Sequence, residues 1–174
     1  MLLVAAAVIV GGAYLVSGPA TGVRVGSRAP DVAVRVLHGQ HPTGIPLLGQ
    51  SPILLLFFDN KYPESVAWLS AAGALHRRFA LEGLAVVGID TYESAADAIQ
   101  YVESNDVQFM VLHDPGGAAS RSAYGGPAEP HAYLIDASGT VLQVYREITD
   151  LARPETRQAL AGILQRLPSQ APPR

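Results

Sequence analysis

The sequence predicts an α/β protein with a central mixed β-sheet flanked by helices. Two apolar runs, ILLLFF at 53–58 and LAVVGI at 84–89, are typical of strands buried on both faces of a sheet. Segments with helical spacing of apolar residues follow each run. Near the end, the turn Ala137-Ser138-Gly139 joins two further strands into a hairpin, which adds antiparallel pairing to the sheet.

The other elements follow from the same rules. Pro63 and Glu64 open a helix that runs to about Leu81, because proline suits the first turn and an acid there favours the helix dipole. Trp68 and Phe79 are among its core-facing side chains. In chain order, we expect strands at 32–37, 53–58, 84–89, 109–112, 131–135 and 140–145, and helices at 63–81, 94–104, 118–124 and 154–167.

Composition excludes several classes of function. The formal net charge of −3 leaves no basic patch for nucleic acid. The chain contains no cysteine, so it has no disulfide, no thiolate nucleophile and no thiolate metal site. Its five histidines form no zinc-binding or paired-histidine pattern. His38, His41 and His131 are only a weak grouping, and we expect neither a metal nor a cofactor.

An uncharged apolar stretch opens the chain, LLVAAAVIVGGAYLV at 2–16. A membrane-spanning helix needs about 20 residues, which the stretch reaches if it continues to residue 20. We expect a retained anchor; a cleaved signal sequence, favoured by the small residues at 17–20, and a buried core helix are the alternatives. The expected organisation is a membrane anchor or signal sequence at 1–20, a linker at 21–30, a domain at 31–168 and a tail at 169–174.

Four segments, in this order and spacing, resemble the membrane-tethered thioredoxin-like proteins of cytochrome c maturation, within the AhpC/TSA redoxin superfamily. They are VGSRAPDVAV, ILLLFFDNKYPESVAWL, LAVVGIDTYESAADAIQYVESNDVQFMVLHDPGGAASRSAYG and EPHAYLIDASGTV. The resemblance implies a thioredoxin-like fold on the periplasmic, extracytoplasmic side of a membrane. Arg24 and Arg28 after the apolar stretch would place it in the cytoplasm instead, but two arginines are a weak bias.

The resemblance also locates a degenerate redox motif. The family's Cys-x-x-Cys falls on Tyr62, Pro63, Glu64 and Ser65, and its cis-proline loop falls on Glu129, Pro130 and His131. Redox chemistry at this place needs a thiolate at a helix N-terminus. A tyrosine with a pKa of about 10 cannot replace it, and a serine forms no disulfide. The thiol-disulfide oxidoreductase and peroxiredoxin activities of the family are therefore not expected, and we expect no catalytic residue.

We expect a redox-inactive thioredoxin-fold module that acts as a protein-binding accessory or structural subunit of a membrane complex. Its partner would be a membrane-associated protein, with residues 2–20 in the membrane. One alternative is a substrate-holding partner in a thiol-disulfide or cytochrome maturation pathway. Another is a hydrolase that uses Ser65 and His131, although no third orienting acid and no glycine-rich nucleophile elbow accompany them.

Overall fold

A computed structural model describes residues 22–37, 42–46, 48–125 and 130–165 of the 174-residue chain. The apolar stretch at 2–20 and the tail at 169–174 lie outside these ranges, so the anchor stays a prediction. Among the described residues, no helix combines the length and the apolar character needed to cross a membrane.

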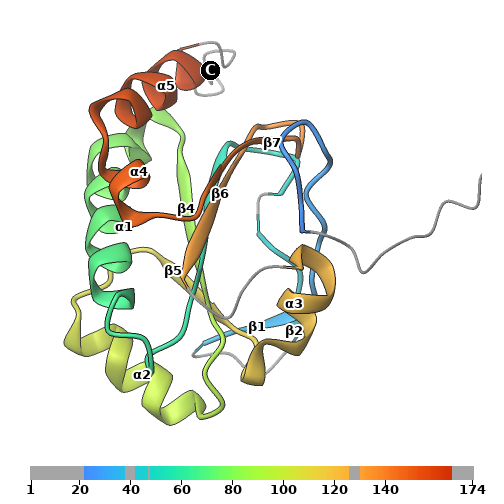
Figure 1. Cartoon of the computed structure of the whole chain (residues 1–174), viewed down its shortest axis with the longest axis vertical. Coiled ribbons are helices and arrows are strands. Elements are labelled where there is room, and N and C mark those ends of the chain that lie inside the picture. The colour runs from blue at the N-terminus through green and yellow to red at the C-terminus, as the bar shows by residue number, and fades with distance from the viewer. Residues whose placement is uncertain (1–21, 38–41, 47, 126–129, 166–174) are drawn as a thin grey trace, which may run out of the picture.

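The described strands form one mixed sheet in the order β2-β1-β5-β4-β3-β6-β7 (Figure 1). β3, β4 and β5 are parallel, and the remaining neighbours pair antiparallel. The strands are β1 (Val34–Val36), β2 (Pro42–Thr43), β3 (Ile53–Phe58), β4 (Ala85–Asp90), β5 (Met110–His113), β6 (His131–Ile135) and β7 (Val141–Tyr145).

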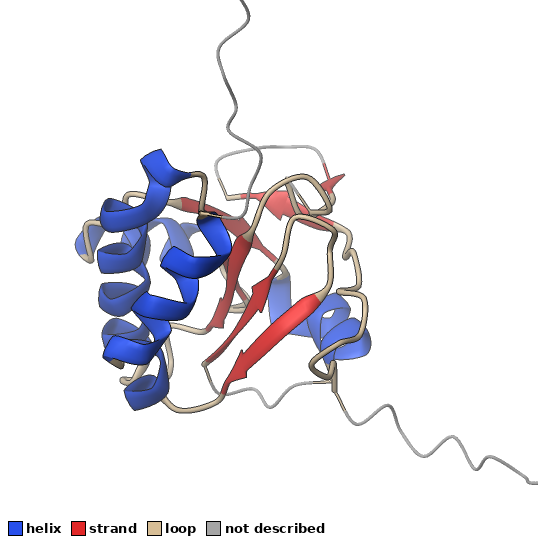
Figure 2. Ribbon diagram, turned by 90° about the horizontal axis from the view of Figure 1, so that it is seen from above, coloured by secondary structure: helices blue, strands red, loops and turns tan. Residues whose placement is uncertain are grey.

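Helices cover both faces of this sheet, as predicted. α1, α2, α4 and α5 lie on one face and α3 lies on the other (Figures 1 and 2). The helices are α1 (Ser65–Phe79), α2 (Ala95–Ser104), α3 (Ala118–Tyr124), α4 (Ile148–Ala152) and α5 (Pro154–Leu164), with short 3₁₀ turns η1 (Ala80–Glu82) and η2 (Pro115–Gly117).

Alternate side chains of β3 enter two separate cores, because successive residues of a strand point to opposite faces. Leu54, Leu56 and Phe58 join the core under α1, α2 and α5, which also contains Trp68 at 3% exposure. Phe57 joins the core on the α3 face with Ile53 and Leu55. The uninterrupted apolar run of β3 is therefore required by burial on both faces.

The segment that the sequence assigns to a linker, 21–30, packs against the domain over its described part. Val23 and Ala29 are 9% and 7% exposed. The Gly26 amide donates to the Val141 carbonyl, and Arg28 forms an antiparallel bridge with Thr140. Gly26 has φ +85°, so the glycines that suggest a flexible linker here provide a turn along the edge of β7.

Candidate functional site

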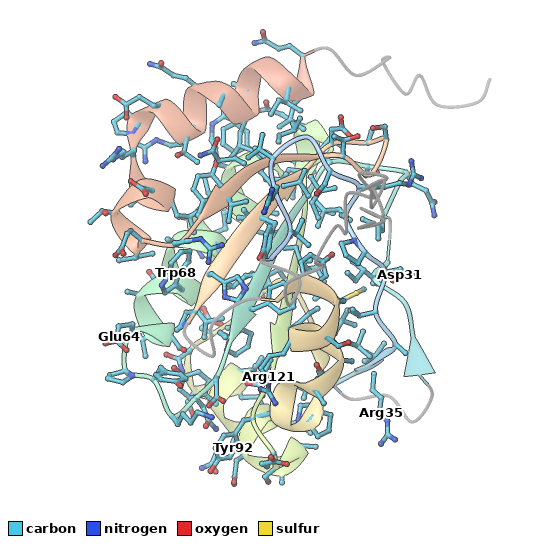
Figure 3. The ribbon with its side chains drawn as sticks, turned by 45° about the vertical axis from the view of Figure 1, so that its right-hand side comes forward. Asp31, Arg35, Glu64, Trp68, Tyr92 and Arg121 are labelled. Atoms are coloured by element: carbon cyan, nitrogen blue, oxygen red, sulfur yellow. The ribbon has the colours of Figure 1, made fainter. Side chains whose placement is uncertain are left out.

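The degenerate motif lies where β3, β4 and β5 end. Asp59 follows β3, Asp90 ends β4 and His113 ends β5, so three ionisable side chains gather at one edge of the sheet. Ligands of α/β proteins commonly bind at the carboxyl ends of parallel strands. In Figure 3, the labelled side chains Glu64, Tyr92 and Arg121 lie in the lower half of the molecule.

The two positions on which the resemblance places the family's cysteines differ in accessibility. Tyr62 is half-buried, whereas Ser65 has no exposed surface. The Ser65 hydroxyl donates to the Asp59 carbonyl at 2.8 Å and accepts from the Asp59 amide at 3.4 Å. Pro63 and Glu64 between them are exposed. Tyr62 can therefore contact a partner, while Ser65 closes the turn between β3 and α1.

An ion pair between the buried Asp59 carboxylate and the exposed Lys61 ammonium supports this turn. Asp59 is 2% exposed, and its carboxylate accepts from the Lys61 amide at 3.0 Å and lies 2.8 Å from the Lys61 ammonium. The hydrogen bond to Asp59 is the largest cause that raises the pKa of Lys61. The same ammonium lies 5.4 Å from the centre of the Tyr62 ring, within the range of a cation–π contact.

The structure adds a buried carboxyl group to which the sequence analysis assigned no role. Asp90 has no exposed surface; its Oδ1 accepts from the Tyr92 amide at 2.9 Å, and its Oδ2 has no hydrogen-bond partner among the described residues. Burial raises the pKa of Asp90 from 3.8 to about 6, which the nearby Asp59 reinforces and His113 opposes. The Tyr101 hydroxyl is likewise buried, and burial raises its pKa.

The cis-proline loop is described from Pro130 onward. Pro130 is buried, and His131 is 4% exposed with its ring stacked on Phe57 at 5.0 Å. Phe57 belongs to the core on the α3 face, whereas α1 packs on the other face. Glu129 lies outside the described residues, so the expected cis bond between Glu129 and Pro130 stays a prediction.

This geometry gives the hydrolase alternative no support. A serine nucleophile must be reachable and must hydrogen-bond to a base. Ser65 is fully buried and donates its proton to a backbone carbonyl, and the ring of His131 stacks in the core on the α3 face.

Metal ligation at the motif has no support among the described residues. No group of three or more His, Asp or Glu side chains in those ranges could hold a metal ion. His38 and His41 lie outside them. A groove of about 420 Å³ runs between β7 and α4–α5, lined in part by Gln143 and Ile163, and it contains none of the predicted site residues.

Known proteins similar to this chain carry the same fold. A candidate thiol:disulfide interchange protein DsbE from Chlorobium tepidum superposes with a TM-score of 0.71 at 22% identity, over 82% of this chain and 99% of that one. A thiol:disulfide interchange protein from Bacteroides sp. gives 0.68 at 16% identity, over 79% and 90%. The thioredoxin domain of a Bacteroides vulgatus thiol-disulfide oxidoreductase gives 0.69 at 15%, over 79% and 99%.

At these identities the structures show the fold alone, and no curated protein matches the chain in sequence. The AhpC/TSA family profile matches residues 25–144, which extend from the segment before β1 into β7. This match covers more than half of the chain and confirms the resemblance that its motifs suggested. The chain therefore belongs to the AhpC/TSA family, with tyrosine and serine where the resemblance places the cysteines of a redox motif.

Proposed function

We propose that this chain is a redox-inactive, membrane-tethered thioredoxin-fold module that binds a protein partner as an accessory or structural subunit of a membrane complex. The proposal rests mainly on which residues of the degenerate motif are buried and which are exposed. Ser65 is built into the β3–α1 turn, and the surface beside it combines the half-buried Tyr62 and the exposed Pro63 and Val66 with two exposed charged side chains, Lys61 and Glu64.

The first argument is chemical. The chain has no thiol, so the thiol-disulfide exchange and peroxide reduction of the redox family lack their nucleophile. At the second motif position, the Ser65 hydroxyl holds the backbone of Asp59. A side chain that ties two elements together supports a structural role for that position.

The second argument is the surface at the start of α1, which we call the Tyr62 surface and define as Lys61, Tyr62, Pro63 and Val66. Val66 is 47% exposed although it is apolar, and Pro63 is also exposed. Tyrosines are enriched in the cores of protein–protein interfaces, where they combine a large apolar area with a hydroxyl. The Lys61 ammonium over the Tyr62 ring adds a charge at the margin of this apolar area.

The proposed mode of binding is strand addition at the neighbouring loop. In the redox family the cis-proline loop receives an extended peptide through backbone groups, a mode that needs no cysteine. Here the equivalent loop leads through Pro130 into β6, next to β3 and the turn that carries Tyr62. A partner segment bound there would contact the Tyr62 surface.

The membrane tether is part of the same proposal. Residues 2–20 are uncharged and match the length of a spanning helix, and the family resemblance favours the extracytoplasmic side. The Val23 amide already donates to the Tyr124 carbonyl of the domain at 3.1 Å. An anchor that ends at residue 20 would therefore hold the domain within a few residues of the membrane.

Two measurements on the full-length chain test this proposal. Purified protein should reduce insulin and consume peroxide no faster than a buffer blank; turnover above the blank would contradict redox inactivity. Gentle detergent extraction should co-purify a membrane-associated protein. A partner that carries its own redox cysteine pair would favour the alternative, a substrate-holding role in a thiol-disulfide or cytochrome maturation pathway.

A further inference from the structure

The groove between β7 and α4–α5 has no part in the proposed function. It has a volume of about 420 Å³ and lies apart from the Tyr62 surface, since none of that surface's residues lines it. Sites that bind a ligand commonly measure about 300–1,000 Å³, so this groove has room for one. We call it the α5 groove.

One wall of the α5 groove is a face of α5. Glu155, Ala159 and Ile163 line it at intervals of four residues, and side chains spaced in this way lie on the same side of a helix. Ala159 is exposed and Ile163 is half-buried. From Glu155 to Ile163 a helix rises about 12 Å. The groove therefore follows most of the length of α5, and its shape suits an extended chain.

The opposite wall is β7, the last strand of the sheet. Leu142 and Tyr145 line the groove on this side, so its wall is apolar and aromatic. The Val141 carbonyl and amide already bond the Gly26 amide and the Ser27 carbonyl along the outer edge of β7. Beyond Val141, no described strand pairs with this edge. The open edge of a sheet can receive the backbone of an extended segment.

The end of the groove at the start of α5 carries a negative charge. The Asp150 carboxylate lies 3.0 Å from the Arg153 guanidinium, so these two charges offset each other. Glu155 is exposed and forms no ion pair within the described ranges. An occupant with apolar side chains and a basic residue at this end would therefore match both the walls and the charge.

The chain itself contains such a segment immediately after α5. Residues 166–174 read RLPSQAPPR, with two arginines, no acidic residue and three prolines, and they lie outside the described residues. The description ends at residue 165, two positions after Ile163 of the groove wall. We propose that residues 167–174 bind back along the α5 groove of their own chain, with Arg174 beside Glu155. This inference goes beyond the proposed function and does not depend on it.

The length of the segment is sufficient for this path. Pro168 disfavours a helical conformation at Leu167, which gives the chain a place to turn. A proline-rich segment extends by about 3.1 Å per residue, so residues 169–174 span about 19 Å. This exceeds the rise of about 12 Å between Ile163 and Glu155. Arg174 can therefore reach the acidic end of the groove.

Two physical effects favour the bound segment. Proline restricts the free segment, so less conformational entropy is lost on binding than for an ordinary peptide. The short connection to α5 gives the segment a local concentration on the order of millimolar, so a contact too weak for a separate peptide is populated. The bound segment would fasten α5 to β7 and would shield the open edge of β7 from other strands.

Paramagnetic NMR on the full-length chain in detergent tests the proposal. The chain has no cysteine, so Ala171→Cys provides a single site for a nitroxide label. The label should broaden the methyl signals of Leu142 on β7 and Thr156 on α5 several-fold more than those of Val36. Val36 lies on β1, five strand spacings from β7, and provides the distant reference.

A matched pair of variants separates binding from mere proximity. Ala159→Arg places a long charged side chain in the groove and should abolish the selective broadening. Gln158→Arg makes the same addition at the neighbouring exposed position, which does not line the groove, and should keep it. Both changes suit an exposed helix position, because arginine has a high helix propensity.

Three results would overturn the inference. The first is broadening of Leu142 no greater than that of Val36, and the second is equal broadening of Leu142 in Ala159→Arg and Gln158→Arg. The third comes from a mixture in which isotope-labelled chains carry no nitroxide and nitroxide-labelled chains carry no isotope. Selective broadening of Leu142 in this mixture would mean that the segment binds a second copy of the chain rather than its own groove.

Discussion

Replacing Ser65 by alanine should destabilise the fold, although the substitution removes only one hydroxyl group. The change removes the only acceptor that the described structure gives the buried Asp59 amide and one of two donors to the Asp59 carbonyl; the other donor is the Tyr62 amide at 3.1 Å. A buried group left without a hydrogen bond costs about 1–3 kcal/mol. Alanine returns about 0.5 kcal/mol of helix propensity. We expect a net loss of about 1–2 kcal/mol.

Urea unfolding followed by tryptophan fluorescence measures this loss. Trp68 is the single tryptophan of the chain and is 3% exposed, so its emission reports the core under α1. The matched control is Ser70→Ala, an exposed position of the same helix, which should gain about 0.5 kcal/mol. If both variants unfold at the same urea concentration, the hydrogen bonds of the Ser65 hydroxyl to the Asp59 backbone do not stabilise the fold. Our account of the second motif position would then be wrong.

Two further predictions test the packing of the sheet and the chemistry of the motif. Gly88→Ala should lower the free energy of unfolding in urea by about 1–3 kcal/mol, because the added Cβ would lie 3.0 Å from the Phe58 ring. In the control Gly162→Ala the added Cβ meets nothing within 4 Å, and this change should stabilise α5 by about 0.5–1 kcal/mol. Equal effects of the two changes would contradict the close packing described for Gly88. The double variant Tyr62→Cys/Ser65→Cys should reduce insulin more slowly than an ordinary redox relative. The buried carboxylates where β3 and β4 end would disfavour the negative charge of a thiolate placed there. Full activity would show that only the cysteines were missing.

Long and strongly patterned elements could be predicted from the sequence. β3, α3 and β6 begin and end where expected, at 53–58, 118–124 and 131–135. A strand buried on both faces needs an unbroken apolar run, and a run of this kind has few alternative structures. The predicted helix at 63–81 begins two residues later, at Ser65, and passes into η1 after Phe79.

Short elements could not be predicted, because tertiary contacts decide whether they form. α4 has five residues, too few for a stable isolated helix, and depends on the burial of Leu151 at 1% exposure. β2 has two residues and exists through its pairing with β1. The segment at 23–29 contains the glycines of a linker and yet packs along β7, since its amides find acceptors there.

The candidate site could be predicted in position and only partly in structure. The family pattern located Tyr62 and Ser65, but the burial of Ser65 depends on how α1 meets β3. Asp90 and Tyr101 belong to different elements, β4 and α2, and no sequence pattern predicts that the fold brings them near each other. The only signal was a carboxylate directly after the apolar run of β4, which is also what an ordinary turn provides.

The structure changes which variants can test partner binding. His131, which the family resemblance places in the cis-proline loop, is buried and stacked on Phe57, so His131→Ala would remove core contacts as well. Val66 replaces it as a second exposed position of the Tyr62 surface. Leu81, fully exposed just beyond the opposite end of α1, provides a control of the same apolar character.

Co-purification from detergent-extracted membranes tests the central claim, that the Tyr62 surface binds a protein partner. Full-length Tyr62→Ala and Val66→Ser should each recover the partner at least 10-fold less well than wild type, since truncating an interface hot spot costs about 2 kcal/mol or more. Leu81→Ser should recover it as wild type does. If Tyr62→Ala and Val66→Ser keep the partner while Leu81→Ser or deletion of residues 169–174 releases it, the partner binds elsewhere and the claim is wrong.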